Sequence, residues 1–116
     1  MGILDRLKRW WSAPDPGSYE PPPGIPAPDR ERELVLYKFD TCPFCQRVLR
    51  VIHARDLDAI QMADTHQDPG AREQLLEETG RTTVPCLFVD GTPLFESADI
   101  KTWLQVYAAR GFGHAT

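Results

Sequence analysis

Cys42 and Cys45 are the residues of this 116-residue chain whose types and spacing best fit a chemical reaction. They belong to the run Cys42-Pro43-Phe44-Cys45, which follows an apolar stretch of strand length and begins a predicted helix. The first N–H groups of a helix are unpaired and the helix dipole adds roughly half a positive charge there, so this position favours a thiolate over a thiol. We predict that Cys42 is a nucleophile and that Cys45, within the first turn and nearer the buried face, resolves the disulfide that Cys42 forms.

The Cys-x-x-Cys spacing has two other interpretations. Half of a zinc site has the same spacing, but zinc is usually held by about four ligands. The other candidate ligands, Cys86, His53, His66 and His114, are scattered along the chain, so we expect no metal. A purely structural pair is the second alternative, although free structural cysteines are more typical of the interior of an element than of its start.

Two further segments have the features of a site for a small anionic peptide. Thr83-Val84-Pro85 precedes an apolar strand, where the backbone of Val84 can pair with an extended peptide; a plain strand-entry proline is the alternative. Glu96-Ser97 begins the last predicted helix, whose free N–H groups suit a carboxylate; an ordinary N-cap is the alternative. Because both segments follow the cysteine pair in one domain, they predict a redox cysteine beside an anion-binding site.

The hydrophobic pattern predicts the elements that position these residues. Short apolar runs rich in β-formers indicate strands, and apolar residues three to four apart indicate helices. The punctuating residues are Asp68 as an N-cap before Pro69, Gly80 as a helix end, Asp90-Gly91 as a hairpin turn, and Ser97 as the cap of a last helix that ends near Gly111. The expected elements are a strand over 34–39, a helix over 43–55, a strand over 59–63, a helix from 69 to about 80, strands over 87–89 and 93–95, and a helix from 97. The order β-α-β-α-β-β-α predicts an α/β domain with a four-stranded mixed sheet and helices on both faces.

Length and composition exclude several classes of protein. The chain has room for one small domain, and its net charge of −4 argues against a nucleic-acid binder. No apolar run approaches the ~20 residues of a membrane-spanning helix. Three cysteines are too few for a disulfide-stapled secreted scaffold, so we expect a reducing, cytoplasmic location.

The first third of the chain has a different composition from the rest. Seven of the eleven prolines lie between Pro14 and Pro28, which predicts an extended Pro-rich linker over 13–32. The linker separates a head, residues 1–12, from a domain over 33–111 with a tail over 112–116. The head has apolar residues at helical spacing and a net charge of +2, which is typical of an amphipathic helix that binds a membrane surface or a groove on a protein partner. Docking onto its own domain and disorder are the alternatives.

Residues 33–110 resemble the glutaredoxin family, a branch of the thioredoxin fold. The resemblance rests on four segments in order: Cys42-Pro43-Phe44-Cys45, Gly80-Arg81-Thr82-Thr83-Val84-Pro85, Asp90-Gly91 and Ser97-Ala98-Asp99-Ile100. Four positions depart from the family pattern: Phe39 stands where a basic residue is usual, with Lys38 one position earlier; Phe44 replaces a tyrosine; Phe95-Glu96 replaces a glycine pair; and Cys86 follows the proline. We expect Cys86 to be a buried core cysteine rather than a third redox thiol.

The resemblance implies a role for each matching residue. Cys42 takes up glutathione, the co-substrate, and Cys45 is the resolving thiol. Thr83 and Val84 pair with the glutathione backbone, and Pro85 is a cis proline. The other implied glutathione contacts are Ser97 for the γ-glutamyl carboxylate, Arg81 for the glycyl carboxylate, and Lys38, Phe44 and Glu96 around them.

We therefore expect a monomeric, glutathione-dependent thiol–disulfide oxidoreductase that reduces protein disulfides and glutathione mixed disulfides. One alternative is a glutathione-transferase-like binding module, indicated by Glu96-Ser97, although the residues after Arg110 leave no room for a transferase's helical domain. Another is an iron–sulfur carrier, which Pro43 disfavours because cluster-binding relatives commonly have glycine there. A third is a redoxin driven by a reductase instead of glutathione.

Overall fold

The order of elements in the computed structural model, which describes residues 17–113, is the predicted one. The strands are β1 (Leu34–Lys38), β2 (Gln61–Asp64), β3 (Cys86–Val89) and β4 (Thr92–Leu94). The helices are α2 (Pro43–Ala54), α3 (Pro69–Thr79) and α4 (Ser97–Gly113). The predicted amphipathic head, residues 1–12, lies outside the described residues. Among the described residues, no helix is long and apolar enough to cross a membrane.

The four strands form one mixed sheet in the order β2-β1-β3-β4. β1 pairs with β2 in parallel and with β3 antiparallel, and β3 pairs with β4 antiparallel through the hairpin. Asp90 and Gly91 make that hairpin turn with φ values of 49° and 86°, both in the left-handed region that a two-residue turn of this kind requires. The predicted four-stranded mixed sheet is therefore confirmed.

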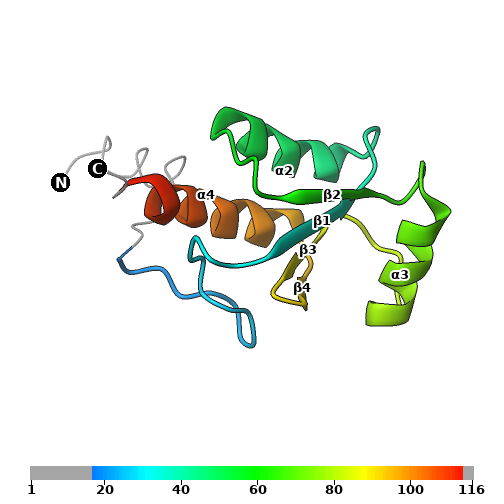
Figure 1. Cartoon of the computed structure of the whole chain (residues 1–116), viewed down its shortest axis with the longest axis horizontal. Helices are drawn as coiled ribbons and strands as arrows, with labels where there is room; N and C mark the ends of the chain where they lie inside the picture. Colours follow the sequence, from blue (N-terminus) through cyan, green and yellow to red (C-terminus); the bar gives the residue numbers. More distant parts are fainter. Residues whose placement is uncertain (1–16, 114–116) are drawn as a thin grey trace, which may run out of the picture.

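The alternation of side chains along β1 separates the two layers that cover the sheet. Leu34 and Leu36 point into the main core, which includes residues of α2 and α4. Tyr37 points to the other face, where Leu75 of α3 and Phe88 of β3 belong to a second, smaller core. Figure 1 shows α2 and α4 running in the same direction along one side of the sheet, with α3 set apart from both.

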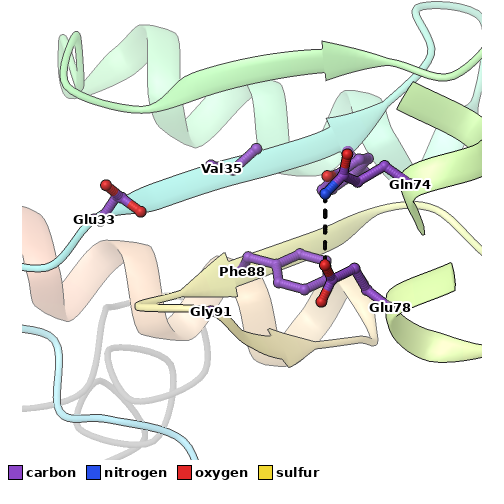
Figure 2. Close-up of a pocket in the computed structure, with 7 residues that line it drawn as sticks. Glu33, Val35, Gln74, Glu78, Phe88 and Gly91 are labelled. Atoms are coloured by element: carbon purple, nitrogen blue, oxygen red, sulfur yellow. Dashed lines mark hydrogen bonds between the residues drawn. The ribbon is translucent and has the colours of Figure 1, made fainter. Parts of the chain in front are cut away.

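The face covered by α3 also carries a pocket of about 130 Å³, which Figure 2 shows. Tyr37 and Phe88 form its aromatic part, with ring centroids 5.2 Å apart. Gln74 and Glu78 of α3 form another side, where the Gln74 amide donates a 3.5 Å hydrogen bond to Glu78. Because the pocket lies on the sheet face opposite α2, it contains neither residue of the cysteine pair.

Most helix ends lie at the residue that the sequence indicated or one residue from it, and the exceptions concern α4. Asp68 caps α3 by accepting a hydrogen bond from the backbone N–H of Gly70, and Gly80 ends that helix with a φ of 76°. Ser97 was predicted to be the cap of α4, and that is wrong. Ser97 is the first helical residue, because the carbonyl of Glu96 already accepts the first intrahelical bond, from the N–H of Ile100 at 3.0 Å.

The last helix also ends later than predicted. It continues to Gly113 instead of ending near Gly111. A glycine within a helix costs only about 1 kcal/mol relative to alanine, so a single glycine does not have to end one.

The Pro-rich segment is not a spacer over the part that the structure describes. We name residues 17–32 the N-terminal strap. Tyr19 and Ile25 of the strap pack against the main core, and Pro28 is buried. Proline lacks a backbone N–H, so the strap does not extend the sheet, but its rings supply apolar surface and its carbonyls remain available as acceptors. The expectation of an extended linker that holds a head away from the domain is therefore wrong for residues 17–32.

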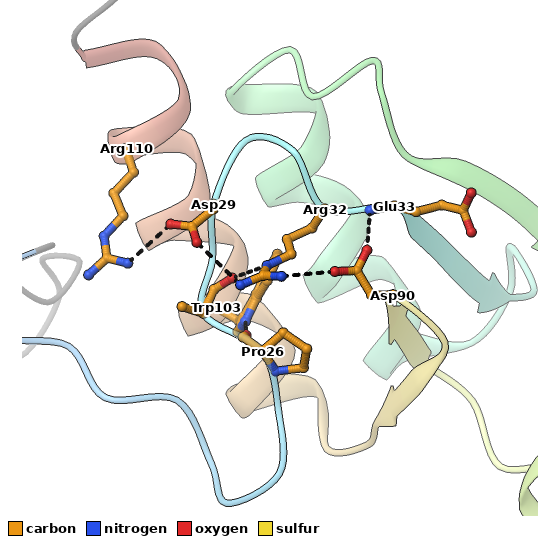
Figure 3. A network of polar contacts seen from close by, with 8 residues as sticks. Pro26, Asp29, Arg32, Glu33, Asp90, Trp103 and Arg110 are labelled. Carbon is orange, nitrogen blue, oxygen red and sulfur yellow. Dashed lines mark hydrogen bonds and ion pairs between the residues drawn. The ribbon is translucent and has the colours of Figure 1, made fainter.

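Polar contacts fasten the strap to the domain at three places, which Figure 3 shows. Asp29 of the strap forms a 3.8 Å ion pair with Arg110 of α4. The indole N–H of Trp103, in α4, donates a 2.9 Å hydrogen bond to the carbonyl of Pro26. Arg32, at the end of the strap, forms a 3.0 Å ion pair with Asp90 of the hairpin. The same carboxylate accepts a 2.7 Å hydrogen bond from the backbone N–H of Glu33. The strap thus joins the last helix to the sheet.

Candidate active site

One edge of the sheet gathers all the segments that the sequence singled out. β1 and β2 end there side by side, with Lys38 opposite Asp64. β3 runs the other way and begins there, with Cys86 opposite Tyr37. β4 reverses direction once more and ends there at Leu94. The loops that follow β1 and β4 and the loop that precedes β3 therefore meet at the same edge.

Cys42 occupies the N-cap of α2, directly after the loop that leaves β1. Its backbone is extended, with φ −77° and ψ 121°, and Pro43 takes the first helical position, where the missing N–H costs least. The Cys42 sulfur accepts a hydrogen bond from the backbone N–H of Cys45 at 3.4 Å. Free helix N–H groups and the helix dipole favour a sulfur anion at this point, so the geometry is that of a nucleophile.

Cys45 is close to Cys42, and both cysteines are buried, Cys45 completely. Its exposed fraction is 0%, against 7% for Cys42. Burial is the main cause that raises the pKa of Cys45 to about 12, and the nearby Cys42 side chain raises it further. A backbone contact from Phe39 and the positive charge of Lys38 act in the opposite direction. Cys45 is therefore a neutral thiol at physiological pH, which suits a resolving residue that reacts only after Cys42.

Cys86 lies in the smaller core, as expected of a structural cysteine. Its exposed fraction is 0%, and burial raises its pKa to about 12. The charge of Arg81 and a backbone contact from Leu94 lower the pKa, but they do not offset the burial. Cys86 therefore lies at the same edge of the sheet as the cysteine pair. It begins a strand, so it lacks the position at a helix start that favours a thiolate.

The loop before β3 has the backbone form that the resemblance implied. The Val84–Pro85 peptide bond is cis. Val84 packs partly against the smaller core, and Thr83 is exposed. Arg81 lies over the ring of Phe95 at 3.9 Å, which ties this loop to the segment that precedes α4. The predicted peptide-binding loop and the start of α4 are thus in contact.

The start of α4 combines free N–H groups with a strained residue. Ser97 is half-buried and Glu96 is exposed. Glu96 has a φ of 71°, in the left-handed region that glycine adopts at no steric cost. The resemblance places a glycine pair at this position, so Phe95-Glu96 retains the backbone shape while a larger residue bears the strain.

Lys38, a predicted glutathione contact, is engaged by two acidic side chains that the sequence analysis did not single out. Its ammonium lies 2.7 Å from a carboxylate oxygen of Asp40 and 3.4 Å from one of Asp64. The hydrogen bond to Asp40 is the largest cause that raises its pKa, and its side chain is only 13% exposed. Next to it, Phe39 stacks on His66 with ring centroids 3.6 Å apart. Lys38 therefore acts on the site through its charge more readily than through a free donor.

Phe44 lies on the outer surface, beside the cysteines. It is the most exposed large hydrophobic side chain among the described residues, at 56%. The guanidinium of Arg47, one turn along α2, lies 5.9 Å from its ring centroid. The structure thus presents an aromatic ring and a cation at the mouth of the site.

The structure brings the predicted residues together at one edge. Cys42 and Cys45 supply two sulfurs of unequal burial, the Val84–Pro85 loop supplies backbone groups, and the start of α4 supplies unpaired N–H groups. Such an arrangement is able to exchange disulfides with a bound, extended, anionic thiol. Within residues 17–113, no group of three or more His, Cys, Asp or Glu side chains is arranged to hold a metal ion.

A comparison with models of known protein families finds one that matches the residues from the first strand of the sheet to the last. The family model described as Glutaredoxin matches residues 34–94, which are 61 of the 116 residues and extend from β1 to the end of β4. The match includes the cysteine pair and the Val84–Pro85 loop, and it ends before Ser97.

Two curated relatives show the extent of the sequence similarity. Glutaredoxin 3 of Escherichia coli (strain K12) is 31% identical over 55 residues, which are 47% of this chain and 65% of that protein. The chloroplastic glutaredoxin-C4 of Oryza sativa subsp. japonica is 30% identical over 80 residues, 62% of this chain and 60% of that protein. The chain thus spans less than two thirds of the length of either relative.

Solved structures of proteins named glutaredoxin are also similar to this chain. A dithiolic glutaredoxin from Trypanosoma brucei brucei has a TM-score of 0.48 and 23% identity, covering 60% of this chain and 74% of that one. A glutaredoxin from Brucella melitensis has a TM-score of 0.45 and 24% identity, covering 68% of this chain and 79% of that one.

Proposed function

The chain belongs to the glutaredoxin family, and on that premise we propose that it is a glutathione-dependent thiol–disulfide oxidoreductase. Its substrates are mixed disulfides between glutathione and protein thiols, together with protein disulfides. Cys42 is the nucleophile, Cys45 resolves, and glutathione is the source of electrons. Cys86 takes no part in the exchange.

The difference in environment between the three cysteines carries this proposal. Cys42 caps a helix and accepts an N–H hydrogen bond, whereas burial raises the pKa of both Cys45 and Cys86 to about 12. Because the thiolate is the reactive form, only Cys42 is placed to begin an exchange near neutral pH.

Release of glutathione from a protein needs only the first cysteine. The Cys42 thiolate attacks the glutathione sulfur of the mixed disulfide, the sulfur–sulfur bond breaks, and the protein thiolate leaves and takes a proton from solvent. Cys42 is then disulfide-bonded to glutathione. The thiolate of a second glutathione attacks that glutathione sulfur, which yields glutathione disulfide and restores the Cys42 thiolate.

Reduction of a protein disulfide needs both cysteines. Cys42 attacks one sulfur of the substrate and becomes disulfide-bonded to it, and the second substrate sulfur leaves as a thiol. Cys45 loses its proton as it attacks Cys42, which releases the fully reduced substrate and forms a Cys42–Cys45 disulfide. Two glutathione molecules then reduce this disulfide and leave as glutathione disulfide.

The predicted glutathione site fits the geometry of this edge. The backbone at Thr83 and Val84 is available for an extended peptide, and the N–H groups at Glu96-Ser97 suit the γ-glutamyl carboxylate. Arg81, an exposed cation that lies over Phe95, is the proposed contact of the glycyl carboxylate. The proposed site is completed by Pro85 as its cis proline, Phe44 as its exposed ring and Lys38 as a partly buried positive charge.

Turnover of two substrates by three single variants tests the proposal. One substrate is a glutathionylated peptide and the other is a peptide with an intramolecular disulfide, each assayed with glutathione and a glutathione-regenerating system. Cys42→Ser abolishes both activities. Cys45→Ser retains most of the first and loses the second, and Cys86→Ala retains both and is the control.

Full activity of Cys42→Ser on either substrate contradicts the assignment of the nucleophile. Turnover that occurs with thioredoxin reductase but not with glutathione contradicts the proposed electron donor.

A further inference from the structure

A groove between α2 and α4 gathers positive charge on a chain that is acidic overall. It encloses about 270 Å³, and its lining includes neither residue of the cysteine pair. We name it the basic groove; its lining residues are Arg47, Arg50, Val51, Ala54, Arg55, Lys101 and Gln105. Four of these seven side chains are cationic and none is acidic, in a chain whose net charge is −4.

The cations of the basic groove are available to a partner. Arg50, Arg55 and Lys101 are exposed, and none of them forms an ion pair with a carboxylate of the described residues. Other cations of the domain differ, since Arg32 and Lys38 are each paired with two carboxylates. The positive charge of the groove is therefore not offset by acidic groups within its lining.

The basic groove is continuous with the redox site. Arg47, at its near end, lies over the exposed ring of Phe44, which stands between the two cysteines in the sequence. α2 and α4 both begin at the cysteine edge of the sheet and run away from it side by side (Figure 1). A chain that brings a disulfide to Cys42 from this side therefore passes over Phe44 and into the groove.

We propose that the basic groove docks an acidic segment of the protein whose disulfide Cys42 attacks, an inference that rests on the proposed function. The stretch from Arg47 to Arg55, the C-cap residue of α2, is about 12 Å long at a rise of about 1.5 Å per residue. About four residues of an extended chain span that length. Guanidinium groups bind carboxylates in a bidentate manner, and Val51 and Ala54 supply apolar surface between them.

A pair of matched peptides tests the docking. Both carry one glutathionylated cysteine followed by four residues, which are Glu in one peptide and Gln in the other. With three exposed ion pairs to gain, kcat/KM for the acidic peptide exceeds that for the neutral peptide by about tenfold at low ionic strength. The preference disappears in 0.5 M NaCl, because salt screens exposed charges.

The variant that tests the surface is Arg50→Gln/Arg55→Gln/Lys101→Gln. It lowers turnover of the acidic peptide to that of the neutral one and leaves the neutral peptide unchanged. The control is Arg72→Gln, which removes an exposed charge from α3 and keeps the tenfold preference. Amide shifts of the labelled protein, titrated with the acidic peptide lacking its cysteine, locate binding on α2 and α4 without any turnover.

The two readouts separate the failure of this inference from that of the proposed function. Turnover of both peptides at equal rates, with no amide shifts on α2 and α4, overturns the docking and leaves the redox function standing. Amide shifts without turnover of either peptide overturn the redox function and with it the role of the groove in substrate docking. Loss of binding to phosphatidylserine vesicles in the triple variant, with equal turnover of both peptides, assigns the groove to a membrane and overturns the inference.

Discussion

Burial of the resolving cysteine makes a quantitative prediction about its reactivity. The double variant Cys42→Ser/Cys86→Ala leaves Cys45 as the one cysteine of the chain. Burial is the largest cause that raises its pKa to about 12, and burial persists when Cys42 is replaced. Since the thiolate is the form that is alkylated, Cys45 should react slowly at neutral pH.

The expected magnitude follows from two opposing effects. At pH 7 a thiol with a pKa of about 12 is ionised in about 1 molecule in 10⁵, whereas an ordinary cysteine with a pKa of about 8.5 is about 3% ionised. The thiolate fraction is thus lower by a factor of about 3,000. A more basic thiolate is intrinsically more nucleophilic, so the rate constant of the Cys45 thiolate is higher by a factor of roughly 40 for a Brønsted slope of about 0.45. In the wild-type chain Cys45 should therefore be alkylated about a hundredfold more slowly than a free cysteine. The double variant should show most of this effect, because Cys42→Ser removes the smaller contribution of Cys42 to the pKa and keeps the burial.

The assay is alkylation by iodoacetamide between pH 6 and 9, followed by mass spectrometry, with free glutathione as the reference thiol. The rate for Cys45 rises about tenfold per pH unit across this range, because the pKa lies above it. The matched variant Cys45→Ser/Cys86→Ala, which leaves Cys42, reacts faster than the Cys45 variant at pH 7. Alkylation of Cys45 as fast as glutathione at pH 7, in a variant whose circular dichroism is native, refutes the inference that burial keeps Cys45 a neutral thiol.

Three further predictions concern the scaffold. Trp103→Phe leaves a carbonyl of the N-terminal strap without its indole donor and lowers the free energy of unfolding by about 2 kcal/mol in urea denaturation; a change below about 0.5 kcal/mol contradicts the anchoring role. Glu96→Gly relieves a left-handed residue and raises the free energy of unfolding by about 1 kcal/mol, whereas the control Ala98→Gly, within the first turn of α4, lowers it. The pKa of Asp90 is held below its usual range, mainly by the N–H of Glu33, so its carboxylate stabilises the fold above the unfolded pKa of about 3.9 and this stability is lost as pH falls through the lower folded pKa. Wild type is therefore more stable than Asp90→Asn at pH 7, and the difference in melting temperature shrinks below about pH 4; an equal difference at both pH values contradicts the assignment.

The sequence predicted the features of the fold that depend on neighbouring residues. The cap at Asp68, the helix end at Gly80 and the turn at Asp90-Gly91 are local patterns, and the structure has all three. The N-terminal strap was misjudged because its docking depends on a residue far along the chain. The carbonyl of Pro26 receives its hydrogen bond from Trp103, 77 positions later, and nothing in a Pro-rich composition indicates such an acceptor role.

The same distinction applies to the site. The position of Cys42 at a helix start could be predicted because strand, loop and helix are consecutive in the sequence. The contact of Lys38 with Asp64 could not, since Asp64 comes beside it only through the register of two parallel strands. The basic groove is a further case, because Arg50 and Lys101 belong to helices that the sequence separates and the fold packs together.

The Cys-x-x-Cys spacing determines both the closeness of the two sulfurs and the difference between their environments. In a helix, residues three and four apart share a face, so Cys45 lies on the same buried stripe as Val48 and Ile52 of α2. Cys42, three residues earlier, is at the N-cap, where the chain has not yet entered the helix and its sulfur receives the N–H of Cys45. One spacing thus brings the two sulfurs within reach of each other, exposes the first to the helix N-terminus and buries the second in the core. The inequality between the thiols is a consequence of helix geometry, and it sets the order in which they react.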